Sequence, residues 1–141
     1  MIYPKKSLGQ NFLIDQNIID KIINIVKIKD KSILEIGPGT GNLTKNILKK
    51  KPKKLIVIEK DNVLAESLIK NLDVDIKILN DDVLKIDETN LDADILTVFG
   101  NLPYNISTEI LCKWILNIKK KSFWFDNLVL MFQKEVADRI I

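Results

Sequence analysis

Hydrophobic residues follow two different spacings along the 141-residue chain. Isoleucines at helical spacing behind Asp15 predict an amphipathic helix over residues 15–27. Short apolar runs bounded by polar or turn residues predict strands, and the amphipathic stretches between them predict helices. The strands are expected at residues 32–37, 54–59, 74–79, 94–100 and 127–132, and the further helices at 42–50, 61–71, 106–116 and from Gln133 onward. Strands that alternate with helices predict an α/β fold with a parallel sheet covered on both faces.

The last predicted helix begins at Gln133, and the sequence ends within it without a Gly or Asn cap and without a following strand. No internal repeat, low-complexity tract or linker divides the chain. Because sheets of this class usually carry more strands after the fifth, we expect residues 1–141 to be the N-terminal part of one domain, with a sheet that is incomplete at its C-terminal side.

The composition removes several classes of chemistry. The chain has no histidine, which excludes histidine triads, imidazole bases and the common zinc ligand sets, so we expect no metal site. No apolar run is long enough to span a membrane, and the N-terminus lacks a signal peptide, so a cytoplasmic location is expected. The net charge is +3, but lysine clusters such as residues 45–54 are typical of solvated helix ends. The single cysteine, Cys112, is expected to be a buried small hydrophobe.

A glycine-rich turn, "EIGPGTG", follows the first predicted strand. Open α/β sheets bind ligands at this edge, and Gly37, Gly39 and Gly41 let a ligand approach main chain that a Cβ would block. Glu59 ends the second predicted strand, where a carboxylate can accept both ribose hydroxyls of an adenosine cofactor. A carboxylate at this position can bind the ribose of a nicotinamide cofactor or of S-adenosylmethionine. Pro38 and the glycine spacing favour S-adenosylmethionine.

Asp82 follows the third predicted strand in "LNDDVL". At this position a carboxylate can accept a hydrogen bond from the adenine amino group of the same cofactor. The alternative is a cap of a helix or turn, and Asp81 competes for the binding role.

The segment "FGNLPYNIST" raises a separate question, because an amide, a proline and an aromatic residue stand together at the end of the fourth predicted strand. Adenine N6 is a poor nucleophile, since its lone pair is delocalised into the ring. Acceptors from Asn101 and the Leu102–Pro103 turn can hold the amine hydrogens so that the lone pair faces a methyl donor, while Tyr104 stacks on the base. The structural alternative is a proline turn in which Asn101 caps a helix and Tyr104 packs.

Five segments together closely resemble the ribosomal RNA small-subunit adenine N6-dimethyltransferase family: "KKSLGQNFLID", "ILEIGPGTGNLT", "VIEKD", "FGNLPYNIST" and "QKEVADRI". The resemblance implies a Rossmann-like class I S-adenosylmethionine-dependent methyltransferase. Its members dimethylate two adjacent adenosines near the 3′ end of small-subunit (16S) rRNA during ribosome biogenesis. By the family's motifs, Asn11, Leu13, Gly37, Gly39, Glu59, Asp82 and Asn101 would contact the cofactor, with Asn101 to Tyr104 as the catalytic turn.

Alternatives remain beside this resemblance. Large-subunit rRNA adenine methylases tend to carry I-P-Y where this chain has "NLPY", and they lack the glycine of "LGQNFL". A non-catalytic rRNA-binding or transcription-factor relative of the same fold is a second alternative, and a nicotinamide oxidoreductase is a more distant one. The family continues into further strands and a helical C-terminal domain. Because residues 1–141 lack those parts, we expect them to be inactive alone. We expect the protein to be a monomer whose partner is small-subunit rRNA.

Overall fold

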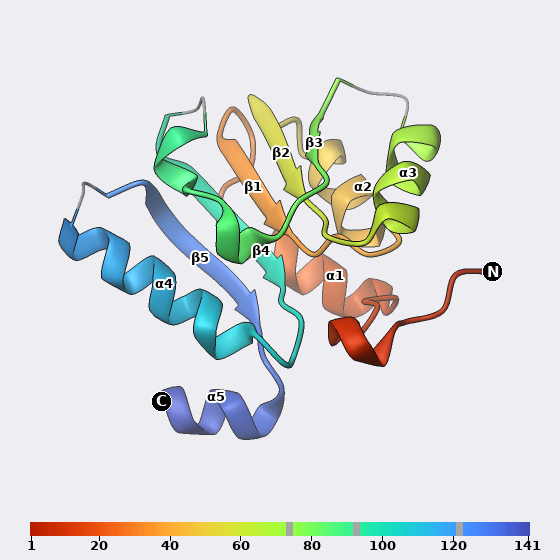
Figure 1. The fold of residues 1–141 in the computed structure, drawn as a ribbon. Helices are drawn as coiled ribbons and strands as arrows, with labels where there is room; N and C mark the ends of the chain where they lie inside the picture. The colour runs from red at the N-terminus through yellow and green to blue at the C-terminus, as the bar shows by residue number, and fades with distance from the viewer. Residues whose placement is uncertain (73–74, 92–93, 121–122) are drawn as a thin grey trace.

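Five parallel strands form one sheet in a computed structural model that describes residues 1–72, 75–91, 94–120 and 123–141 (Figure 1). The strands are β1 Ser32–Ile36, β2 Lys54–Ile58, β3 Lys77–Leu79, β4 Leu96–Asn101 and β5 Phe125–Met131. Their order across the sheet is β3-β2-β1-β4-β5, and every neighbouring pair is parallel. The predicted α/β fold with a parallel sheet is confirmed.

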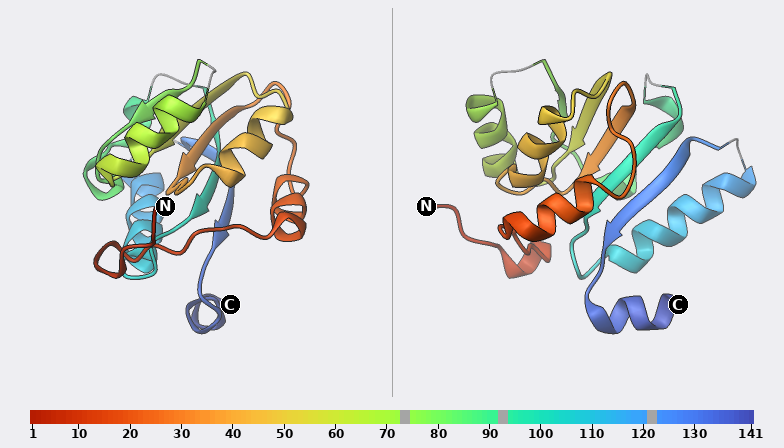
Figure 2. Two further views of the ribbon diagram at one scale, coloured as in Figure 1. Left: turned by 90° about the vertical axis from the view of Figure 1, so that its right-hand side faces the viewer. Right: turned by 180° about the vertical axis from the view of Figure 1, so that it is seen from behind.

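Helices cover both faces of this sheet (Figure 2). The longer helices are α1 Gln16–Ile23, α2 Asn42–Lys49, α3 Asn62–Asn71, α4 Ser107–Lys120 and α5 Lys134–Ile140, and the short 3₁₀ helices are η1 Lys6–Leu8, η2 Val83–Lys85 and η3 Glu88–Asn90. Buried residues of α1, α2 and α3 pack on one face, and buried residues of α4 pack on the other. The chain therefore has the layers of a doubly wound sheet.

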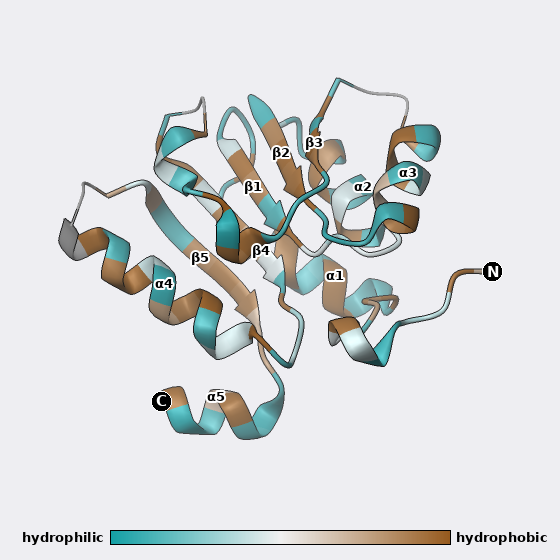
Figure 3. Cartoon of the chain, in the orientation of Figure 1, coloured by the Kyte–Doolittle hydropathy of each residue, from teal (hydrophilic) through white to brown (hydrophobic). Residues whose placement is uncertain are grey.

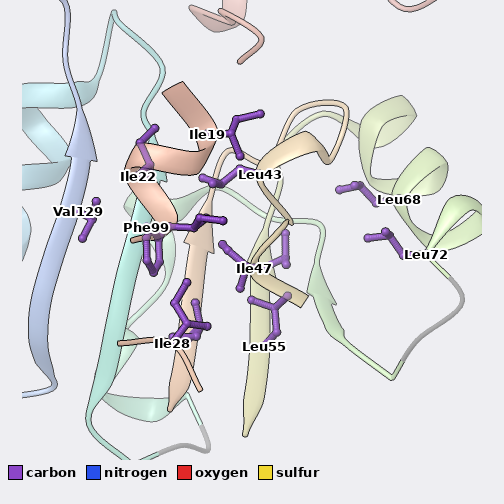
Figure 4. Close-up of a cluster of buried hydrophobic side chains, with 13 residues drawn as sticks. Ile19, Ile22, Ile28, Leu43, Ile47, Leu55, Leu68, Leu72, Phe99 and Val129 are labelled. Carbon is purple, nitrogen blue, oxygen red and sulfur yellow. The ribbon is translucent and has the colours of Figure 1, made fainter. Parts of the chain in front are cut away.

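Alternation along the strands divides the core into two clusters. In β1, Ile33 faces α1 and α2, while Leu34 faces α4. Figure 4 shows the first cluster, where side chains of α1 and α2 meet Phe99 of β4 and Leu55 of β2. Figure 3 shows hydrophobic residues along the central strands. β1 has a neighbouring strand on each side and helices over each face, and it is therefore buried over its whole length. Its carboxyl end supports the turn that follows.

Several elements end at other residues than the sequence predicts. The first helix stops at Ile23 instead of residue 27, since the Asn24 side chain donates to the Asp20 carbonyl at 2.7 Å and the chain turns away. The third strand covers only Lys77–Leu79, and Val74 of the prediction lies outside the described residues. The fourth strand begins at Leu96 rather than at residue 94.

The expectation for Cys112 is wrong, because its side chain is exposed. Helix α4 buries Ile110 and Trp114, which lie four residues apart on one side, and Cys112 between them faces the opposite side. At the end of the chain, α5 buries none of its residues. Within the described ranges, no helix is long and apolar enough to cross a membrane.

Candidate functional site

The carboxyl ends of β1, β2 and β4 bring the predicted site residues to one edge of the sheet. Ile36, the last residue of β1, is in register with Ile58 of β2 on one side and Gly100 of β4 on the other. The strand order reverses between β1 and β4, which is where open α/β sheets bind their ligands. The glycine turn, Glu59 and Asn101 therefore lie side by side.

Gly37 makes the closest main-chain approach in the site. Its φ is +66°, and a Cβ added there would lie 2.8 Å from the main-chain oxygen of Asn101. Both facts require glycine, because any other residue would be strained at this φ and its Cβ would push the Asn101 turn away. The glycine turn after β1 and the "NLPY" turn after β4 are thus in direct contact.

The Glu59 carboxylate lies beneath the glycine turn and is 6% exposed. It accepts a hydrogen bond from Asp61 N at 2.9 Å and another from Gly39 N at 3.3 Å. Burial raises the pKa of Glu59, although these two backbone donors act in the opposite direction. Glu59 therefore links the glycine turn to the start of α3.

A second carboxylate, Glu35, lies behind the turn and is 1% exposed. Thr44 in the first turn of α2 donates its hydroxyl to Glu35 Oε2 at 2.6 Å. Burial, with a smaller contribution from the charge of Glu59, raises the pKa of Glu35 to about 8, against the effect of the Thr44 hydrogen bond. Glu35 is not among the site residues predicted from the sequence, although it is the glutamate of "EIGPGTG".

Asp82 performs the capping role that the sequence left open as an alternative. Its Oδ1 accepts from Leu84 N at 3.0 Å at the start of η2, and its Oδ2 pairs with Lys60 at 3.2 Å. Burial opposes ionisation, but these partners outweigh it and lower the pKa of Asp82. Asp81 is exposed and accepts from the main-chain N–H of Asp82. Asp82 lies one strand beyond Glu59, and it lines neither of the two cavities described below.

The loop after β3 is fastened to α4 by a buried ion pair. Lys113 donates to Glu88 Oε1 at 2.7 Å and to the carbonyls of Val83 and Ile86, while Trp114 Nε1 donates to the same Glu88 oxygen at 2.8 Å. The Glu88 side chain is fully buried. These contacts hold the η2 turn, and with it the position of Asp82 relative to the sheet.

The catalytic turn predicted at residues 101–104 contacts the N-terminal segment of the chain. The Asn101 Nδ2 donates to the carbonyl of Asn11. Tyr104 donates its main-chain N–H to the Gly9 carbonyl at 3.2 Å and its hydroxyl to the Lys6 carbonyl at 3.1 Å. The amide of Asn101 is thereby oriented with its nitrogen toward Asn11, which leaves Oδ1 as the acceptor on its other side.

Two cavities meet at this turn. The larger, of about 240 Å³, lies next to α4 and the end of β5, and is lined by Asn11, Leu13, Ile18, Asn101, Leu102, Tyr104, Ser107, Met131, Phe132 and Gln133. The smaller, of about 30 Å³, lies over the glycine turn and is lined by Gly9, Gln10, Asn11, Phe12, Gly37, Gly39, Glu59, Leu64, Asn101 and Pro103. Asn11 and Asn101 belong to both cavities and separate them.

Most of the predicted site residues are therefore neighbours. Gly37, Gly39, Glu59 and Pro103 surround the smaller cavity, and Leu13, Leu102 and Tyr104 surround the larger one. Two residues at the site are not among those predicted from the sequence. They are Phe12, whose ring would lie 3.1 Å from a Cβ at Gly39, and Asp61. The quoted motifs "LGQNFL" and "VIEKD" contain both residues, but their partners cannot be read from local spacing.

Comparisons with known proteins agree with the resemblance found in the sequence. A family model described as Ribosomal RNA adenine dimethylase matches residues 3–141. Ribosomal RNA small subunit methyltransferase A of Pelagibacter ubique (strain HTCC1062) is 66% identical over 140 residues, which are 99% of this chain and 53% of that protein. The protein of the same name from Ehrlichia ruminantium (strain Gardel) is 48% identical, over 100% of this chain and 54% of its own length. The chain spans about half the length of the curated relatives it matches.

Solved structures give the same result for the fold. A dimethyladenosine transferase from Plasmodium falciparum matches 92% of this chain and 46% of its own, with a TM-score of 0.73 and 34% identity. The 23S rRNA methyltransferase ErmE matches 90% of this chain and 50% of its own, with a TM-score of 0.74 and 28% identity. The predicted Rossmann-like methyltransferase fold is confirmed.

Proposed function

This chain belongs to the ribosomal RNA adenine dimethylase family, and we propose that it is the N-terminal part of an S-adenosylmethionine-dependent rRNA methyltransferase. The proposed reaction is the N6-dimethylation of two adjacent adenosines near the 3′ end of small-subunit (16S) rRNA. The proposed partner is small-subunit rRNA, which the protein meets as a monomer in the cytoplasm during ribosome biogenesis. Its remaining strands and a helical C-terminal domain would follow residue 141.

The residues around the smaller cavity fit the proposed cofactor chemically. Gly37 and Gly39 have no side chains between the main chain and a ligand. Their φ values of +66° and +58° are ones that glycine adopts without strain. From this cavity we assign Gly37 to the methionine part and Glu59 to the ribose hydroxyls, with Asn11 and Gly39 as further contacts. Asp82, which lies outside both cavities, is assigned to the adenine amino group, and Leu13 of the larger cavity is a further contact. When bound, the cofactor supplies an electrophilic methyl group on its sulfonium.

The enclosed space over the glycine turn is small, at about 30 Å³, whereas pockets for ligands of this size measure roughly 300 Å³ or more. The ring of Phe12 lies against Gly39 and occupies the space above the turn. We propose that cofactor binding displaces this ring from the glycine turn.

The position of Asn101 carries the proposal. Its amide separates the two cavities, and its nitrogen is bonded to Asn11, so Oδ1 can accept a hydrogen from a target amine in the larger cavity. With the Leu102 carbonyl before Pro103 as the second acceptor, both amine hydrogens would be held and the lone pair would face the cofactor. Stacking on Tyr104 would contribute about 1–3 kcal/mol, and orientation alone can contribute roughly 7–11 kcal/mol to such a reaction.

The test uses an extended chain, defined as residues 1–141 continued into the remaining part of the Pelagibacter ubique relative. Unmethylated small ribosomal subunits are incubated with labelled S-adenosylmethionine and either the extended chain or residues 1–141 alone. We expect label in rRNA only with the extended chain. Label that appears in large subunits instead would favour the large-subunit methylase alternative, and an extended chain that binds rRNA without transfer would favour the non-catalytic one.

The role of Asn101 is tested in the same assay. Asn101→Ala in the extended chain should lower turnover far more than cofactor affinity, because its contact to the target amine matters most as the methyl transfers. A loss of cofactor affinity as steep as the loss of turnover would make Asn101 mainly a binding residue and contradict the proposed mechanism.

A further inference from the structure

Residues 5–12 form a strap that crosses the site between α3 and the turn after β4. At the α3 end, the Asp61 carboxylate accepts from Lys5 Nζ at 2.7 Å and from Gln10 Nε2 at 3.1 Å. Gln10 in turn accepts from the main-chain N–H of Lys5 at 2.8 Å, which closes a small ring of polar contacts. The strap is thus fastened to α3 by one carboxylate.

At its other end the strap is fastened to the catalytic turn. The carbonyls of Lys6 and Gly9 accept from the hydroxyl and the main-chain N–H of Tyr104, and the carbonyl of Asn11 accepts from Asn101 Nδ2. These bonds come from backbone carbonyls, so they depend on where the strap's backbone lies. A shift of the strap changes the hydrogen bond that orients Asn101.

Asp61 has more contacts than a helix cap needs. Its Oδ1 accepts from Val63 N at 2.9 Å and from Leu64 N at 3.2 Å, which caps α3, and its own N–H donates to Glu59. The side chain is 2% exposed, whereas Lys5 is half exposed. Burial opposes ionisation, but the hydrogen bonds from Lys5, Leu64 N and Gln10 outweigh it and lower the pKa of Asp61.

We propose that Asp61 is a positioning residue for methyl transfer: through its ion pair with Lys5 it fixes the strap, and the strap's Asn11 carbonyl fixes the amide of Asn101. This inference rests on the proposed function for its catalytic consequence, but the mechanical link from Asp61 to Tyr104 is independent of that function. The Asp61 side chain would touch neither cofactor nor target, and it would position Asn101 through the strap.

Asp15 provides a matched control. It caps α1 with the same pair of contacts, to Asn17 N at 2.9 Å and Ile18 N at 3.3 Å. Asn is as good a cap as Asp, so Asp→Asn removes the charge and preserves the cap at either position. Only at Asp61 does the substitution also remove the ion pair to the strap. Lys5→Met removes the ion pair from the other side, and Lys5→Arg keeps it.

The first measurement follows exchange of the Tyr104 main-chain N–H with solvent deuterium in the extended chain, without cofactor. Loss of a half-exposed, charge-assisted contact should speed this exchange by about two- to fivefold in Asp61→Asn and in Lys5→Met. The double variant should exchange no faster than either single one, and Lys5→Arg and Asp15→Asn should match the parent. Unchanged exchange in Asp61→Asn, or an equal increase in Asp15→Asn, overturns the inference.

The second measurement is methyl transfer to small subunits at saturating S-adenosylmethionine. Asp61→Asn and Lys5→Met should lower kcat by a factor similar to the change in Tyr104 exchange, with Lys5→Arg restoring it and the KM for the subunits little changed. A kcat equal to that of the parent overturns the positioning role. If the parent itself transfers no methyl, the proposed function fails, while the exchange measurement still decides whether Asp61 holds the strap.

Discussion

The buried acid Glu35 should make the stability of the protein depend on pH in a direction opposite to that of most carboxylates. Its pKa is about 8 in the folded protein and 4.5 as the reference value. Between these two values the unfolded chain has lost the proton and the folded chain still holds it. The free energy of unfolding therefore falls as pH rises through this window, by about 1.4 kcal/mol per pH unit for this one group.

Glu35→Gln removes the titration with little change of shape. The Gln side-chain oxygen can still accept from the Thr44 hydroxyl, which donates to Glu35 Oε2 at 2.6 Å in the parent. The contribution of Glu35 is fully present below pH 4.5 and is lost progressively up to pH 8. We therefore expect the variant to be similar to the parent near pH 5 and more stable than the parent by several kcal/mol at pH 8.

Urea unfolding of the extended chain at pH 5, 6, 7 and 8 measures this difference. Other carboxylates titrate in both proteins, so only the difference between parent and variant is interpreted. Glu66→Gln provides the control, since it removes a carboxylate of α3 that is exposed and not buried. If the free energy of unfolding changes with pH equally in the parent and in Glu35→Gln, the Glu35 carboxyl is not neutral in the folded protein and the reasoning is refuted.

Three further changes test other parts of the site in the extended chain. Glu59→Ala should weaken S-adenosylmethionine binding by about 1.5–3 kcal/mol, and calorimetry that shows unchanged affinity would remove Glu59 from the ribose site. Gly37→Ala should abolish transfer while the fold persists, because its Cβ would meet the Asn101 carbonyl at 2.8 Å; normal turnover would contradict this. Lys113→Met should lower the free energy of unfolding by about 3–5 kcal/mol, because it leaves the buried Glu88 carboxylate without its cation and with only the Trp114 hydrogen bond. Adding Glu88→Gln should recover part of that loss, and no recovery would mean that the charge is not the cause.

Site residues that follow a strand directly could be predicted from the sequence, because parallel strands end at one edge of the sheet. On this ground the sequence alone predicts that the glycine turn, Glu59 and Asn101 lie together. It also predicted both possible roles of Asp82, of which the structure shows the cap. The cofactor contact of Asp82 stays a prediction.

Contacts that join distant parts of the chain could not be predicted in this way. Asn11 and Asn101 are 90 residues apart, and Gln10 and Asp61 are 51 residues apart. Neither pair belongs to one element, so no periodicity relates its two members. The wrong expectation for Cys112 has a different cause. Cys112 lies in an apolar helical stretch, but α4 buries only the side that carries Ile110 and Trp114 and leaves Cys112 exposed.

The charge of the residues around the larger cavity bears on the proposed mechanism. Its described lining residues include no carboxylate, lysine or histidine, and its polar groups are amides, hydroxyls and main chain. The positive charge of the bound cofactor would lower the basicity of a carboxylate placed there as a general base. Neutral acceptors avoid this conflict, because they orient the amine before transfer and leave its proton to be lost to water afterwards. They also tolerate a second methylation, since a monomethylated amine still has one hydrogen for Asn101 Oδ1 or the Leu102 carbonyl to hold while the lone pair faces the cofactor.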